Sequence, residues 1–90
     1  MLHSTLSLDL HCEVSSNVRD QLNEALQAFG WEKVLNFASI WTRQHPPGVY
    51  FPNCVSQAKK EAANAAEVAG LAHYSASVVV SKSPPQIWQA

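Results

Sequence analysis

The sequence predicts an α+β domain, because its hydrophobic residues repeat with a strand period in some segments and a helix period in others. Apolar side chains alternate over residues 2–14, whereas they recur at helical spacing over residues 18–29. A β-branched run over residues 74–82 adds another strand. Ninety residues with 47% hydrophobic content fit one domain, spanning 1–90, around one core.

The first strand separates an apolar face from a polar one. Its apolar face carries Leu6, Leu8, Leu10 and Cys12, and its polar face carries Ser7, Asp9, His11 and Glu13. Because successive side chains of a strand point to opposite sides, we expect the apolar face to pack beneath the helices. The polar face is expected to lie on an uncovered side of the sheet.

The first helix has a start signal and a stop signal. Residues 15–17, Ser-Ser-Asn, offer three candidate N-caps before the apolar stripe begins. Gly30 stands where a left-handed residue ends a helix, and Trp31 is placed to fold back on Leu26 in a Schellman motif. The segment 18–29 is therefore predicted to be an amphipathic helix.

The second half predicts two strands, a helix and a final strand. We expect strands over 34–43 and 49–51, separated by a turn at 46–48 and closed by Pro52. Asn53 or Ser56 caps an alanine-rich helix that runs to about Ala69, and Gly70 ends it. The order β-α-β-β-α-β predicts a ferredoxin-like split β-α-β sandwich, with an antiparallel sheet and both helices on one face.

An apolar tail follows the last strand. Pro84 and Pro85 break the strand, and Ile87 and Trp88 come after them with no evident place in a monomer core. A net charge of −1 leaves little repulsion between copies. We therefore expect a homodimer in which Ile87 and Trp88 contribute to the interface.

Charge and cysteine content restrict the class of protein. Six basic residues against seven acidic ones argue against a strongly basic nucleic-acid binder. The cysteines, Cys12 and Cys54, form no CxxC pair and are expected to be reduced thiols. No stretch approaches the roughly 20 apolar residues of a membrane span, and no basic leader precedes one. We expect a cytoplasmic protein without membrane contact.

One pattern in the first forty residues points to a family. An aspartate, Asp9, ends a hydrophobic first strand, and a helix with an early arginine, Arg19, follows it. A corner of the form Phe-Gly-x-x-x-Val spans 29–34, and Ser39 stands shortly before an aromatic residue. This pattern resembles the small CRISPR-associated adaptation proteins and their relatives, the VapD-type toxins and GhoS-type antitoxin ribonucleases.

The resemblance implies a dimeric ferredoxin-like fold and a metal-dependent endoribonuclease or toxin–antitoxin role. It assigns Mg²⁺ binding to Asp9, with two copies brought together across the dimer. His11 lies on the same strand face and is a candidate general base for attack by an RNA 2′-hydroxyl. The alternative is that Asp9 and His11 are ordinary solvated residues of an open sheet face.

Three basic residues are candidates for nucleic-acid binding. Arg19 follows from the family pattern, while Lys33 and Arg43 flank a group of aromatic residues that resembles a base-stacking platform. The alternative is that tryptophans such as Trp31 and Trp41 belong to the core. Asp20 also stands where the family commonly has a second arginine.

Two functions remain open at this point. The first is an Mg²⁺-dependent endoribonuclease that acts on RNA, favoured by the order Asp9, Arg19 and Phe29-Gly30. The second is a non-enzymatic dimeric module that binds itself or a regulatory protein partner. Neutral charge and Asp20 favour the second.

Overall fold

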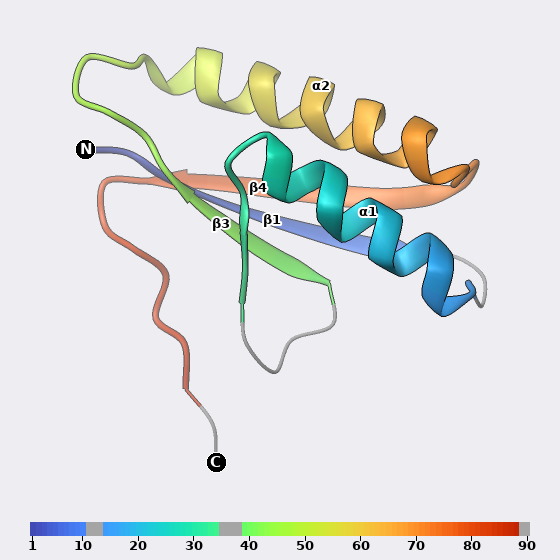
Figure 1. The fold of residues 1–90 in the computed structure, drawn as a ribbon. Coiled ribbons are helices and arrows are strands. Elements are labelled where there is room, and N and C mark those ends of the chain that lie inside the picture. The colour runs from blue at the N-terminus through green and yellow to red at the C-terminus, as the bar shows by residue number, and fades with distance from the viewer. Residues whose placement is uncertain (11–13, 35–38, 89–90) are drawn as a thin grey trace.

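A computed structural model shows an α+β fold in which two helices pack on a four-stranded antiparallel sheet (Figure 1). The structure describes residues 1–10, 14–34 and 39–88. Its elements are β1 (His3–Leu10), α1 (Ser16–Ala28), β2 (Glu32–Lys33), β3 (Ile40–Gln44), α2 (Phe51–Ala69) and β4 (Tyr74–Ser81). This order confirms the predicted ferredoxin-like arrangement.

The sheet has the strand order β2-β3-β1-β4, so β1 is central and β4 is an edge strand. β1 pairs with β3 on one side and along its whole length with β4 on the other. Both helices cover the same face, and within the described residues no helix lies on the other face (Figure 1).

The alternation of apolar and polar side chains along β1 places the core on the predicted face. Leu6 and Leu8 are buried, and Leu10 packs at the edge of the cluster, whereas Cys12 lies outside the described residues. The core cluster consists of Leu6, Leu8, Leu22, Leu26, Trp31, Trp41, Ala58, Ala62, Ala65, Ala66, Ala69 and Leu71. It therefore fills the space between the sheet and the two helices.

Helix α1 begins and ends at the residues that its signals indicate. The Ser15 side chain accepts a hydrogen bond from the Val18 backbone amide at 3.3 Å. At the other end, Gly30 N–H donates to Gln27 and Trp31 N–H donates to Leu26. These two bonds form the Schellman motif, and Gly30 has the positive φ of 101° that the motif requires.

The prediction for the central hairpin was wrong in position. The stretch predicted as one strand over 34–43 includes most of β3 and begins just after β2, and β2 and β3 pair with each other. Residues 49–51, predicted as a strand, lead into α2, which starts at Phe51. Pro52 stands in the first turn of α2, where its missing N–H costs no helical hydrogen bond.

Helix α2 packs closely because the residues on its buried face are small. Its alanines at 58, 62, 65, 66 and 69 are all buried, and Gly70, at a φ of +75°, ends the helix as predicted. Within the described ranges, neither helix combines the length and the apolar character needed to cross a bilayer.

We predict that enlarging a buried alanine of α2 destabilises the fold. Ala65 is fully buried, so Ala65→Leu adds volume where the core has no room and should lower the free energy of unfolding by about 1–3 kcal/mol. Ala63→Leu, on the exposed side of the same helix, should change it by less than about 0.5 kcal/mol. Urea denaturation measures both, and equal effects would contradict this packing.

Candidate functional site

The uncovered face of the sheet is built from small polar side chains. Residues directly opposite in antiparallel strands share a face, so Thr5 lies between Thr42 and Val79. By the same rule Ser7 lies between Ile40 and Ser77. This open face therefore combines hydroxyl groups with a few aliphatic side chains.

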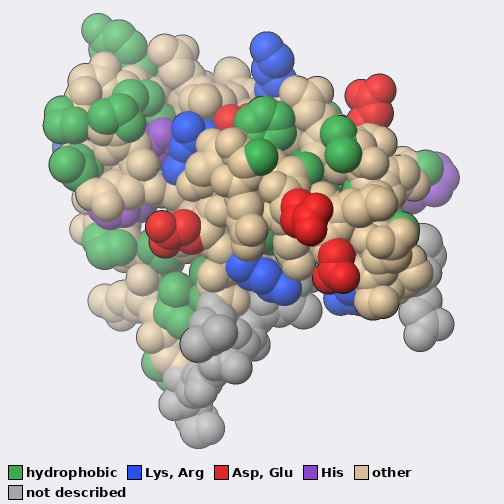
Figure 2. Space-filling model, viewed as in Figure 1, with side chains coloured by type: hydrophobic (Ala, Val, Ile, Leu, Met, Phe, Trp, Pro, Cys, Tyr) green, Lys and Arg blue, Asp and Glu red, His purple; other side chains and the backbone are tan. Residues whose placement is uncertain are grey.

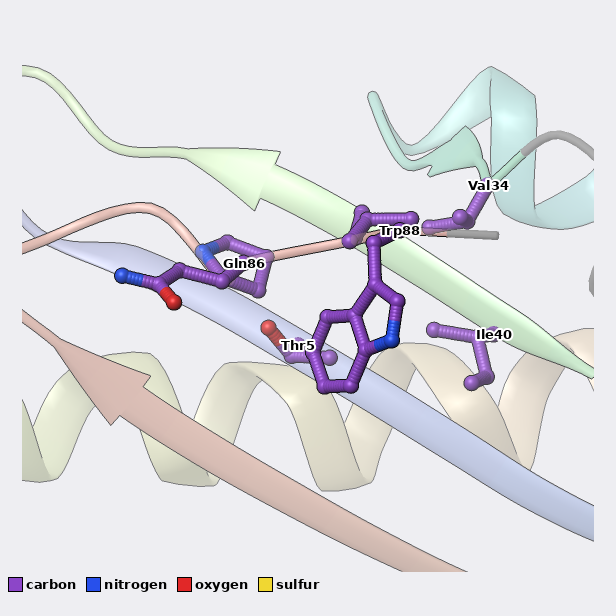
Figure 3. Close-up of a pocket in the computed structure, with 7 residues that line it drawn as sticks. Thr5, Val34, Ile40, Gln86 and Trp88 are labelled. Atoms are coloured by element: carbon purple, nitrogen blue, oxygen red, sulfur yellow. The ribbon is translucent and has the colours of Figure 1, made fainter. Parts of the chain in front are cut away.

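The C-terminal tail crosses this face. A pocket of about 420 Å³ separates the tail from the sheet, and its lining comes from both. It is formed by Thr5, Val34, Ile40, Pro85, Gln86, Ile87 and Trp88. Figure 3 shows the Trp88 indole projecting over β1, between Thr5 and Ile40. The tail thus brings an aromatic side chain to the centre of the open face.

The tail does not bury its apolar side chains. Trp88 is 76% exposed and Ile87 is 50% exposed, and Val79, opposite Thr5 on the same face, is 63% exposed. A second pocket of about 390 Å³ lies between the start of the tail and the sheet, with His3 and Glu32 in its wall. The tail thus lies over the face while Ile87 and Trp88 keep at least half of their surface exposed.

A buried carboxylate ties α2 to the sheet on the other face. Glu61 is only 6% exposed, and Arg43 of β3 donates to both of its oxygens, at 2.7 and 3.0 Å. Trp31 donates its indole N–H to the same carboxylate at 3.1 Å. A buried charge is tolerated when it is paired and hydrogen-bonded, and Glu61 meets both conditions.

A second buried polar pair joins the start of β1 to the residue after β3. The Ser4 hydroxyl and the His45 ring nitrogen Nε2 lie 2.7 Å apart, and both residues are buried. Burial lowers the pKa of His45, and the positive charge of Arg43 lowers it further, while Glu61 opposes the shift. The neutral imidazole is therefore the form that the fold favours.

The structure separates the proposed site residues. Asp9 is exposed on the open face, opposite Ser75 of β4, and His11 lies outside the described residues. Arg19 is exposed on α1. Lys33 pairs with the buried Trp41 and so belongs to the helix-covered side, at the outer strand β2.

Arg43 also belongs to the helix-covered side. It pairs with Ser4, and its guanidinium group is engaged by Glu61. Since Ser4 and Asp9 lie five residues apart on β1, Arg43 is about 17 Å from Asp9 along the strand, on the opposite face. Asp9 and the three basic candidates are therefore not gathered into one site.

Sequence reasoning missed the buried polar residues Glu61 and His45. The signal for Glu61 was present, because it interrupts the apolar stripe of α2 between Ala58 and Ala65. A charged residue in such a stripe indicates a buried partner. His45 carried no comparable signal, since its pairing with Ser4 depends on a contact across 41 residues.

Charged side chains are interspersed on the helix-covered side rather than gathered by sign (Figure 2). Among the residues that the structure describes, no three His, Cys, Asp or Glu side chains are grouped to hold a metal ion. Comparison with protein-family models, curated proteins and solved structures gave no significant match. The geometry of the chain itself is therefore the basis for proposing a function.

We predict that acid destabilises the fold through His45. The unfolded chain takes up a proton as the pH falls below about 6.5, while the lowered pKa keeps His45 neutral in the folded state. This contribution to stability is thus fully present well above pH 6.5, and it declines as the pH falls through 6.5 towards 5.5, by at most about 1.4 kcal/mol per pH unit.

Urea denaturation at pH 7.5 and 5.5 measures this decline. His45→Gln should reduce the difference between the two pH values, whereas His73→Gln, at an exposed position, should leave it unchanged. If His45→Gln loses as much stability between pH 7.5 and 5.5 as the wild type, His45 is not the cause of the decline.

Proposed function

We propose that this protein is a dimeric interaction module that associates with a second copy through the open sheet face and the C-terminal tail. The exposure of Trp88 carries the proposal, because 76% of this large side chain faces solvent although it lies over an apolar pocket. Contiguous exposed apolar groups commonly mark a protein interface. A second copy supplies both the side chains that fill the pocket and the cover for Trp88.

The composition of the open face supports association with protein rather than nucleic acid. At the described strand positions of this face, no lysine or arginine occurs, and the charged groups are the acidic Asp9 and Glu32. Phosphate contacts by cations supply most of the affinity for nucleic acid. Hydroxyl and aliphatic groups, by contrast, fit the packed interior of a protein interface.

The area needed for a stable dimer requires the sheet face as well as the tail. A stable interface buries about 800 Å² on each partner, whereas one aromatic side chain contributes about 150–250 Å². Trp88 and Ile87 therefore serve as anchors, and the surrounding face provides most of the contact. The proposal predicts a twofold arrangement in which each tail contacts the partner's sheet.

We predict that the dimer depends on the tail. In sedimentation experiments over a range of concentrations, deletion of residues 84–90 should give a monomer. Trp88→Ala should raise the dissociation constant by about 30-fold, as expected for a central aromatic anchor worth about 2 kcal/mol. Tyr50→Ala removes another aromatic residue, 74% exposed, from the loop before α2 and should change nothing. An unaltered dimer after the deletion would refute the proposal.

The endoribonuclease hypothesis is a second candidate, and the exposure of Asp9 on the open face favours it. A dimer across this face brings two copies of Asp9 to one interface, and two carboxylates with water and a phosphate satisfy Mg²⁺. If so, Asp9→Asn should abolish Mg²⁺-dependent RNA cleavage and leave the melting temperature unchanged. Equal cleavage by the two proteins, or none by the wild type, would eliminate this candidate.

A further inference from the structure

Within the described residues, no further strand pairs with the outer edge of β4. β4 is eight residues long and lies at the end of the described sheet, with β1 as its neighbouring strand. Its sequence, Tyr-Ser-Ala-Ser-Val-Val-Val-Ser, contains no charged residue and no proline. Proteins commonly protect long edge strands with such residues, because exposed backbone N–H and C=O groups invite another strand to pair.

A groove runs beside this edge, between β4 and α2. It encloses about 440 Å³ and is lined by Leu6, Val55, Ala58, Lys59, Ala62, Tyr74, Ala76, Ser77 and Val78. The short side chains of Ala58, Ala62 and Ala76 leave this space open. An added strand would direct every second side chain into the groove, as the alternation of a strand requires.

We propose that the groove binds an extended segment of another protein, which adds to β4 as a fifth strand and places an acidic residue beside Lys59. Backbone hydrogen bonds to β4 provide affinity, and the groove selects alternate side chains. This site goes beyond the proposed self-association, because it uses the edge of the sheet and not its open face.

The charge of the groove identifies the chemistry of this partner. Lys59 is the one charged residue in the lining. Arg43 and Glu61 form an ion pair, and within the described residues no carboxylate lies within 4 Å of the Lys59 ammonium group. An acidic residue of the incoming strand would pair with it.

A second copy of this chain fits the edge less well. Its β4 has no acidic residue to offer Lys59. A twofold pairing of two β4 edges also brings α2 and its copy to the same side of the extended sheet, where the two Lys59 side chains would repel each other. Charge therefore favours a different protein as the occupant.

The register along the groove defines a short motif. Lys59 and Val78 line the same groove, and Ala76 is the next residue of β4 on that face. In an antiparallel addition, two partner residues that are two positions apart lie opposite Val78 and Ala76. The proposal assigns the acidic residue to the position opposite Val78 and an aliphatic residue to the position opposite Ala76. The expected motif is an acidic residue, any residue and then an aliphatic one.

The experiment uses capped, dye-labelled peptides and the full chain. The probe is Thr-Glu-Thr-Val-Thr-Val-Thr, and its charge-swapped form has lysine in place of glutamate. Fluorescence anisotropy should show the glutamate peptide binding about fivefold more tightly, as expected for a partly exposed ion pair worth up to about 1 kcal/mol. Lys59→Glu should reverse this preference.

The matched control is Lys60→Glu, which changes the neighbouring exposed lysine outside the groove lining and should leave the preference as in the wild type. Amide hydrogen exchange should show new protection in β4, and Trp88→Ala should bind the peptide normally. The proposal would be overturned if the wild type bound the two peptides equally, or if Lys60→Glu reversed the preference as Lys59→Glu does. Protection confined to a strand other than β4 would also overturn it. So would protection of β4 that rises with protein concentration without peptide and persists in Trp88→Ala, because a second copy would then occupy the edge.

Discussion

The alternation of apolar and polar side chains along β1 is the constraint on which the rest of the structure depends. This strand is central, so its two faces decide which side of the whole sheet is core and which is open. Both helices pack on the face that carries the buried Leu6 and Leu8. Thr5 and Ser7 lie on the opposite face. A register shift of one residue would exchange these faces, and the tail would then lie over an apolar surface.

The alanines of α2 have two structural effects. On the buried side they let the helix approach the sheet and α1 closely, and Glu61 then reaches Arg43 and Trp31. At the flank next to β4, the same short side chains leave a groove unfilled. A larger residue at Ala62 would fill part of this groove, so the packing of the core and the shape of the proposed binding site have a common origin.

The fold was predictable where a local signal decided the structure. Period-two alternation placed β1, and Gly30 with its neighbours placed the end of α1, because neither depends on distant contacts. The hairpin was misplaced because β-branched and aromatic residues recur through 34–43, and neither glycine nor proline marks a turn there. Pro52 was interpreted as a strand stop although it also marks a helix start. The Ser4–His45 pair required knowledge of the register itself.

The two proposed surfaces could be occupied together, because the partners would approach the sheet from perpendicular directions. Strand addition uses hydrogen bonds in the plane of the sheet, whereas a copy on the open face approaches along the normal to that plane. β4 takes part in both: its backbone edge and Val78 face the groove, and Val79 points to the open face. Alternation along a single strand would thus leave both proposed surfaces available at the same time.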